Sequence, residues 1–324
     1  MNILITGGLG YIGGRIASYI KKKAPDSHIF LTTNKLHRRP SWTGKFEVLK
    51  MDLLDEESIE NCLVGNSIDL IIHLAAVNEI DSIKNPEFAL GVNTQGTYRL
   101  LNLANAYKIK RFIYFSTFHV YGRTSDSIIT EETPTKPFHP YAITHRAAED
   151  FVNFFNHYNK MTTLIFRLSN GYGYPKDIEI NRWTLIFNDL CRQAVTSGRI
   201  VLKSSGKQHR DFITLHDVAR AVYHFLFIVP DKWGDGLYNL GGNCSMSILD
   251  VAKKISDVYR KKYGKNIIEI KTAQDGVDLI IPEPVKYSIE KIAQTGFFLK
   301  GDMILEIERT MDLCEGFING INEQ

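Results

Sequence analysis

The N-terminal segment combines an apolar run, a cluster of glycines and a helical pattern, and this combination constrains the fold more than any other feature. Residues 3–5 are apolar, Gly7, Gly10 and Gly13 follow, and residues 12–22 have the apolar spacing of a helix. A strand that turns sharply into a helix presents backbone N–H groups and the positive helix end to an anion. Glycines at these positions let the backbone approach a pyrophosphate and let helix and strand pack closely. The segment therefore predicts a dinucleotide-binding turn, with an ordinary tight turn as the alternative.

Composition is that of a globular protein without a nucleic-acid surface. The 324 residues are 44% hydrophobic and 23% charged, and the formal net charge is only +3. The four cysteines are scattered, without the close pairs of a metal site or a redox dithiol, so we expect no bound metal. The N-terminus has the pattern of a strand rather than a leader, and no apolar run reaches the ~20 residues of a membrane span. We therefore expect a cytoplasmic protein with no membrane partner.

Strand-like runs alternate with amphipathic helical stretches through the first half of the chain, and the alternation weakens afterwards. This pattern predicts an α/β fold with a doubly wound parallel sheet. We expect a Rossmann domain at residues 1–170 and a smaller mixed α/β substrate lobe mainly at residues 171–324, with a strand and helices returning from the second half to the first domain. The expected strands span residues 3–6, 29–32, 46–49, 70–74, 111–116 and 164–168, and the expected helices span residues 12–22, 56–61, 92–107 and 141–158.

Several segments together resemble one known family. These segments are TGGLGYIGG at 6–14, Asp52, His73-Leu74-Ala75-Ala76, Asn93, FSTFHVYG at 115–122, PYAITH at 140–145, RLSNGYG at 167–173 and RDF at 210–212. They are similar to the Ser/Thr and Tyr-x-x-x-Lys centre and the flanking motifs of extended short-chain dehydrogenases/reductases, in the nucleotide-sugar epimerase/dehydratase branch. The resemblance covers nearly the whole chain.

The resemblance implies a catalytic tyrosine. Removing hydride from a sugar carbinol carbon requires a base on the hydroxyl group, and a tyrosine of ordinary pKa is only about 0.1% ionised at pH 7. In the family, a lysine one helical turn later supplies positive charge and binds the nicotinamide ribose, while a Ser/Thr hydroxyl steadies the developing oxyanion. Tyr141 is thereby implied as the acid/base and Thr117 as the oxyanion partner.

Two departures from the family pattern affect the expected chemistry. His145 stands where the family has lysine, four positions after Tyr141 on the same helix face. Histidine is about three-quarters neutral at pH 7, so we expect it to be a catalytic residue that orders the ribose with a weaker charge; a weakened centre is the alternative. Phe118 and His119 follow Thr117, where the 4,6-dehydratases have Asp-Glu. Without that carboxylate pair, we do not expect dehydration.

The resemblance also implies which residues bind the cofactor and the substrate. No Asp follows the second strand to bind an adenosine ribose, and Lys35 or Arg38 could meet a 2′-phosphate. The cofactor is therefore NAD or NADP, with NADP favoured. The implied cofactor-binding residues are Gly7, Gly10, Tyr11, Ile12, Gly13, Thr33, Asn34, Lys35, Arg38, Asp52, Leu53, Leu74, Ala75, Ala76, Asn93, Ser116, Tyr141 and His145; the implied substrate-binding residues are Thr117, Phe118, His119, Asn170 and Arg210.

The sequence thus predicts an enzyme that transfers hydride at C4 of a sugar linked to a nucleotide diphosphate, most simply a C4 epimerase. A nucleotide-sugar dehydrogenase or a 4-keto-sugar reductase is the enzymatic alternative, and a cofactor-sensing binding protein with weakened catalysis is the alternative from another class. The helices at residues 92–107 and 141–158 carry apolar residues around much of their circumference. In relatives these helices pair across a two-fold axis, so we expect a homodimer formed through a four-helix bundle.

Overall fold

The computed structural model describes residues 1–35, 39–124, 126–159, 161–231, 233–264, 268–273 and 286–319. Arg38, one of the predicted cofactor-binding residues, lies outside these ranges. Among the described residues, no helix is both long enough and apolar enough to cross a membrane.

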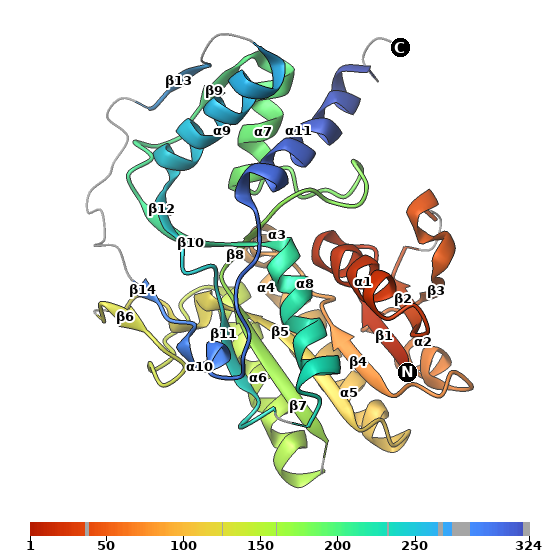
Figure 1. Cartoon of the computed structure of the whole chain (residues 1–324). Helices are drawn as coiled ribbons and strands as arrows, with labels where there is room; N and C mark the ends of the chain where they lie inside the picture. Colours follow the sequence, from red (N-terminus) through yellow and green to blue (C-terminus); the bar gives the residue numbers. More distant parts are fainter. Residues whose placement is uncertain are drawn as a thin grey trace.

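A seven-stranded parallel sheet forms the centre of the first lobe (Figure 1). Its order is β11-β7-β5-β4-β1-β2-β3, and every neighbouring pair in it is parallel. Parallel strands buried on both faces need near-continuous apolar sequence, and β4 and β5 show this. The strands are β1 (Asn2–Thr6), β2 (His28–Thr33), β3 (Glu47–Lys50), β4 (Leu70–His73), β5 (Arg111–Thr117), β7 (Thr162–Leu168) and β11 (Leu237–Leu240).

Helices cover both faces of this sheet, which confirms the predicted doubly wound fold class. On one face, α1 (Tyr11–Lys23) and α8 (Leu215–Tyr223) pack their apolar sides on the sheet in a single core. On the other face, α2 (Glu56–Leu63), α5 (Thr97–Ala106) and α6 (Pro140–Tyr158) form a second core. The carboxyl ends of the strands therefore meet along one edge of the sheet, where ligands of such folds bind.

The second lobe has its own core, between α7 (Ile186–Ser197), α9 (Ile248–Tyr263) and α11 (Met303–Asn319). Small sheets join it to the first lobe, and strand β11 returns from the second half to pair with β7. The remaining elements are α3 (Glu79–Lys84), α4 (Pro86–Ala89), α10 (Glu290–Ala293), β6 (Ile128–Ile129), β8 (Asn170–Tyr172), β9 (Arg199–Val201), β10 (His209–Thr214), β12 (Ser245–Ser247), β13 (Glu269–Lys271), β14 (Lys286–Tyr287) and the short helical turns η1 (Ser41–Lys45), η2 (Leu90–Gly96), η3 (Phe118–Tyr121) and η4 (His224–Ile228).

One helix differs from its predicted form. We expect a single helix over residues 92–107, whereas the structure has the π-helical turn η2 followed by α5. Gly96, at the junction, lies against the loop after β3, and a Cβ atom there would come within 2.8 Å of the Leu53 Cβ. The helix has a π-helical turn at this contact, and the apolar spacing of the sequence does not reveal such a local change.

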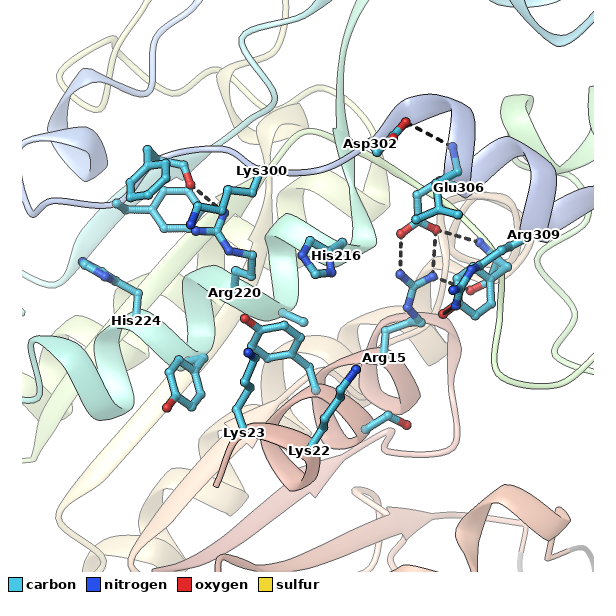
Figure 2. Close-up of a pocket in the computed structure, with 18 of the residues that line it drawn as sticks. Arg15, Lys22, Lys23, His216, Arg220, His224, Lys300, Asp302, Glu306 and Arg309 are labelled. Carbon is cyan, nitrogen blue, oxygen red and sulfur yellow. Dashed lines mark hydrogen bonds and ion pairs between the residues drawn. The ribbon is translucent and has the colours of Figure 1, made fainter. Parts of the chain in front are cut away.

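A buried ion pair joins the two lobes beside a cavity of about 900 Å³ (Figure 2). The Arg15 guanidinium, from α1, donates to both carboxylate oxygens of Glu306 on α11, and the Nη1–Oε2 distance is 2.9 Å. Both side chains are buried, and the guanidinium also lies 3.8 Å from the centre of the Tyr174 ring. Burial removes the hydration of both charges, and their attraction to each other offsets this desolvation cost.

Removing one member of this pair should destabilise the protein strongly. We expect Glu306→Gln to lower the free energy of unfolding by about 3–5 kcal/mol, because it leaves the Arg15 charge buried without its partner. Chemical denaturation monitored by circular dichroism measures the difference.

An exposed ion pair provides the control. Glu269 lies 3.5 Å from Lys271 with both side chains largely in water, so Glu269→Gln should change the free energy of unfolding by less than about 1 kcal/mol. Equal, small effects of the two substitutions on the free energy of unfolding would show that the buried ion pair between the lobes does not stabilise the protein more than an exposed one.

Candidate active site

The glycine turn ends at the N-terminus of α1, as the sequence predicts. Gly7 has φ +63°, a conformation that favours glycine, and its carbonyl accepts the N–H of Gly10 at 2.9 Å. A Cβ atom on Gly13 would come within 2.5 Å of the Gly7 carbonyl oxygen, so helix and turn touch. The N-cap residue Gly10 offers no side-chain acceptor to the first-turn N–H groups, unlike the capped helices α8 and α9. A phosphate fits this uncapped helix end.

The end of β4 forms the neighbouring wall of this site. The Thr6 hydroxyl accepts the N–H groups of Leu74 and Ala75, each at 3.1 Å, and lies 2.6 Å from Nδ1 of His73. A Cβ atom on Gly7 would lie 3.1 Å from Ala75. The structure therefore brings two of the predicted cofactor-binding residues, Leu74 and Ala75, directly beside the turn.

Several other predicted cofactor-binding residues have contacts within the protein. The Tyr11 hydroxyl donates to the Gly173 carbonyl at 2.7 Å, and Asp52 accepts the N–H of Leu54 at 2.9 Å. Asn93 is buried, accepts the N–H of Val77 at 2.7 Å and donates to the Thr144 hydroxyl at 3.0 Å. Ile12 is the second residue of α1, and Leu53 is buried before α2. Ala76 follows Ala75, Thr33 ends β2, and Asn34 and Lys35 follow it.

Two buried polar atoms on β5 and α6 have no protein partner. They are the Ser116 hydroxyl, near the end of β5, and Nε2 of His145 on α6. Buried polar groups are almost always hydrogen-bonded, so unpaired ones mark places where polar groups of a ligand fit. Together with the uncapped helix end, they show that the residues present suit a bound dinucleotide.

Thr117 and Tyr141 meet at the same edge. Thr117 is the last residue of β5; its hydroxyl accepts the N–H of His119 at 3.2 Å and hydrogen-bonds to the phenol of Tyr141. The pKa of Tyr141 is raised to about 12: burial is the main cause and Glu79 adds to it, whereas Arg182 and the Thr117 hydrogen bond oppose it. The phenol is thus held protonated at neutral pH until positive charge approaches.

His145 lies beside Tyr141 but carries no charge there. The two ring centres are 4.5 Å apart, and burial lowers the pKa of His145 to about 3. Burial also raises the pKa of Tyr114 well above its ordinary value, so this phenol keeps its proton. The Tyr114 hydroxyl lies 2.7 Å from Nδ1 of His145 and therefore donates to it. The ring proton then resides on Nε2, which makes His145 a neutral donor at its unpaired nitrogen.

Positive charge at the centre comes from the second lobe. Arg182 lowers the pKa of Tyr141, and Arg210, on β10, lowers that of His119. Arg146 follows His145 along α6 but pairs with Asp150 at 2.5 Å, so it does not replace the family lysine. Asn170, on β8, donates to the backbone of β10 at 2.9 Å, which places it close to Arg210 in the chain's fold.

Three side chains meet on the other side of Tyr141. Nε2 of His119 lies 3.9 Å from a carboxylate oxygen of Glu79 on α3, and the imidazole of His139 lies 5.2 Å from that of His119 between ring centres. Within the described part of the chain, this is the set of ligand-type atoms, all within 4.8 Å of one another, that has the spacing of a metal site. The ring of Phe118, a predicted substrate-binding residue, instead packs against the tilted ring of His119 and edge-on against Tyr287.

Sequence reasoning missed four residues of this centre: Glu79, Tyr114, His139 and Arg182. A signal exists only for His139, because a residue before Pro140 at a helix start is a candidate N-cap; its Nδ1 accepts the N–H of Ala142 at 3.4 Å. The other three lie outside the motifs, and only the packing of α3, β5 and the second lobe brings them to Tyr141.

Known proteins are similar to this chain in sequence and in fold. The model of the NAD dependent epimerase/dehydratase family matches residues 3–241. A dTDP-glucose 4,6-dehydratase of Haemophilus influenzae is 29% identical over 90% of this chain and 90% of its own length. A dTDP-D-glucose 4,6-dehydratase of Dictyostelium discoideum is 32% identical over 79% of this chain, which spans 62% of that protein's length. A solved UDP-glucose 4-epimerase of Thermus thermophilus, in complex with NAD, has a TM-score of 0.81 at 22% identity and covers 98% of this chain and 99% of its own.

These relatives correct one expectation. We excluded 4,6-dehydration because Phe118 and His119 replace a carboxylate pair, and this exclusion is wrong, since the similar sequences are 4,6-dehydratases over most of the chain. The structure supplies the physical reason. A carboxylate is present beside His119, but it comes from Glu79 on α3 rather than from the residues next to Thr117.

The glycine turn can be tested by filling it. We expect Gly10→Val to abolish binding of NAD and NADP, because the added side chain occupies the space at the helix end that a pyrophosphate needs. Isothermal titration calorimetry measures the affinity, and circular dichroism shows whether the fold is kept.

Gly44→Val is the matched control, because a Cβ atom there meets no atom within 4 Å. It should leave the affinity unchanged. A folded Gly10→Val protein with normal affinity would mean that the dinucleotide binds elsewhere.

Proposed function

This chain belongs to the NAD dependent epimerase/dehydratase family, and from this membership we propose that it transfers hydride at C4 of a nucleotide-linked sugar. The observation that carries the proposal is the contact of Tyr141 with Thr117 at the edge of the sheet where the glycine turn also lies. Epimerisation and dehydration would both pass through the 4-keto sugar that this hydride transfer forms. We propose that hydride return gives the C4 epimer. Dehydration is the second candidate, and the pair formed by Glu79 and His119 favours it.

The proposed roles follow from the hydrogen bonds of the centre. A bound nicotinamide would supply the hydride acceptor and donor for C4, and the turn at residues 7–13 together with His145 would hold the cofactor. Tyr141 takes the proton of the C4 hydroxyl group. The Thr117 hydroxyl, which is hydrogen-bonded to the phenol of Tyr141, stabilises the negative charge that develops on the C4 oxygen. The neutral Nε2–H of His145 donates to a cofactor hydroxyl, in the orientation that Tyr114 fixes. Arg182 supplies the positive charge that favours the phenolate.

The proposed substrate is a nucleotide-diphosphate sugar held by the second lobe. Arg210 suits a diphosphate, because its planar guanidinium can meet two phosphate oxygens, and Asn170 lies on the neighbouring strand. We assign the cofactor to residues 1–170 and the sugar nucleotide mainly to residues 171–324. Lys35 is exposed just after β2, where it could bind the 2′-phosphate of NADP. The proposed cofactor is therefore NAD or NADP.

The product assay uses Tyr141→Phe. We expect this variant to bind NAD nearly normally and to turn over at least about 10²-fold more slowly, because it lacks the proton carrier. Chromatography with mass spectrometry of UDP-, GDP-, CDP- and dTDP-sugars resolves epimers of equal mass from dehydrated products. Turnover should also rise with pH, because the active form is the phenolate of a group whose pKa is raised.

Tyr223→Phe is the control, since that tyrosine stacks on Phe227 away from the centre. Net formation of reduced nicotinamide would identify a dehydrogenase instead, and net consumption of reduced nicotinamide would identify a keto-sugar reductase. Binding of NAD without turnover of any sugar would identify a cofactor-sensing protein.

We also propose a homodimer. Tyr98 on α5 and Phe151, Phe154 and Tyr158 on α6 are exposed and form one aromatic surface, in which the rings of Tyr98 and Phe151 lie 5.1 Å apart. Exposed apolar surface of this kind marks an interface, and a self-complementary one suits a two-fold dimer with a four-helix bundle.

Light scattering at micromolar concentration should therefore give the mass of a dimer. Phe154→Asp should give monomers, because it introduces a charge into the apolar surface, whereas Phe298→Asp should not, because that exposed ring lies outside α5 and α6. A monomer in the unaltered protein contradicts the proposal.

A further inference from the structure

The cavity beside the ion pair of Arg15 and Glu306 is separate from the candidate active site (Figure 2). Helices α1 and α8 of the first lobe form one part of its wall, and α11 of the second lobe forms another. None of the described residues proposed to bind the cofactor or the sugar nucleotide lines it. Its volume of about 900 Å³ lies within the range of small-molecule sites, about 300–1,000 Å³.

Positive side chains dominate the wall of this cavity. Among the described residues that line it, seven are lysine or arginine and two are acidic. Both acids already have partners, because Glu306 accepts from Arg15 and Asp302 accepts backbone N–H groups in the first turn of α11. Arg220 pairs with Asp217 at 2.8 Å. The lining cations that form no ion pair with a described carboxylate are Lys22, Lys23, Lys176, Lys300 and Arg309.

These five unpaired cations come from four segments of the chain and line one space. In Figure 2, Lys22 and Lys23 extend from α1, Lys300 lies above them on the left and Arg309 lies on the right. Lys176 follows from the loop after β8. All but Lys176 are exposed, so a ligand can reach their charged ends. Like charges around a concave surface repel one another and create a positive potential, which a bound anion would relieve.

Aromatic rings hold two of the unpaired cations against the cavity wall. The guanidinium of Arg309 lies 5.5 Å from the centre of the Tyr174 ring and donates to its hydroxyl at 3.2 Å. The ammonium of Lys300 lies 4.6 Å from the ring centre of Phe298, which is itself 58% exposed. Such contacts restrict side chains that would otherwise move freely. Less conformational entropy is therefore lost when a ligand binds to these cations.

We propose that this cavity is a second ligand site, which binds a small molecule carrying two or more linked phosphate groups and bridging the two lobes. Ammonium and guanidinium groups donate charge-assisted hydrogen bonds to phosphate oxygens. One phosphate group carries about two negative charges at neutral pH, so the five unpaired cations exceed what a single phosphate can neutralise. A polyphosphate can meet Lys22 and Lys23 of the first lobe and Arg309 of the second together.

Calorimetric titration with inorganic tripolyphosphate tests this site in the protein saturated with NAD, which occupies the glycine turn. We expect one tripolyphosphate to bind per chain, with an affinity that falls as the salt concentration rises. Lys22→Glu and Arg309→Glu should each weaken binding by about tenfold or more, because each replaces a cation by an anion. Lys261→Glu is the matched control: it makes the same change of charge at an exposed lysine of α9 outside the cavity, and should leave the affinity nearly unchanged.

Arg210→Ala separates the cavity from the proposed diphosphate contact of the substrate, and tripolyphosphate binding should persist in this variant. Loss of binding in Arg210→Ala, with normal binding in Lys22→Glu and Arg309→Glu, overturns the proposal. Absence of binding to the unaltered protein overturns it too, as does equal weakening by Lys261→Glu. An effect of only one of the two cavity substitutions overturns the bridging of the lobes. Circular dichroism and the affinity for NAD verify that each variant is folded.

ATP in place of tripolyphosphate distinguishes a nucleotide from a simple polyphosphate as the ligand. Tighter binding of ATP, lost in Phe298→Ala, identifies a nucleotide whose base contacts that exposed ring. Equal binding of ATP and tripolyphosphate shows that the phosphate groups alone are recognised. None of these titrations requires turnover of a sugar, so failure of this site and failure of the proposed function are separate results.

Discussion

A buried ion pair between Glu149 and Arg167 fixes the helix on which the candidate chemistry depends. The guanidinium of Arg167, on β7, donates to both carboxylate oxygens of Glu149 on α6, at 2.7–3.2 Å. It also donates to the Tyr121 hydroxyl at 3.0 Å, which in turn donates to Asn239 on β11. Moving α6 would separate the two buried charges and leave each without its partner, which is energetically costly. The ion pair therefore favours a single position of α6 on the sheet. Tyr141 and His145 lie on the same helix, so the ion pair also fixes their positions.

Burial also leaves the imidazole and phenol groups beside Tyr141 without a positive charge of their own. His73 and His145 are neutral because burial lowers both pKa values to about 3, and Tyr114 remains a phenol. The positive charges that affect Tyr141 and His119 come from Arg182 and Arg210. In a family whose lysine supplies this charge from the catalytic helix itself, the present chain draws it from the lobe assigned to the substrate. Acid–base chemistry is thereby coupled to the placement of that lobe.

The sequence predicts the parts of this structure that local patterns determine. Apolar runs locate six of the seven sheet strands to within a few residues, and glycine spacing locates the turn before α1. The contact of Tyr141 with Thr117 follows because both end or begin an element at the same sheet edge. The π-helical turn at residues 90–96 and the donor Tyr114 could not be predicted, because each depends on contacts with segments distant in the sequence.

The error about dehydration shows where local reasoning from a motif fails. The residues after Thr117 contain no carboxylate, and the inference that the site has none assumed that an acid/base pair must be adjacent in sequence. Proton transfer requires only that the groups be adjacent in space. Helix α3 begins after the loop from β4, and its N-cap Asn78 accepts the N–H of Asp81, which sets the direction in which Glu79 leaves the helix. The carboxylate therefore reaches His119 from a different βα unit, and the centre keeps an imidazole and a carboxylate although the motif lacks the latter.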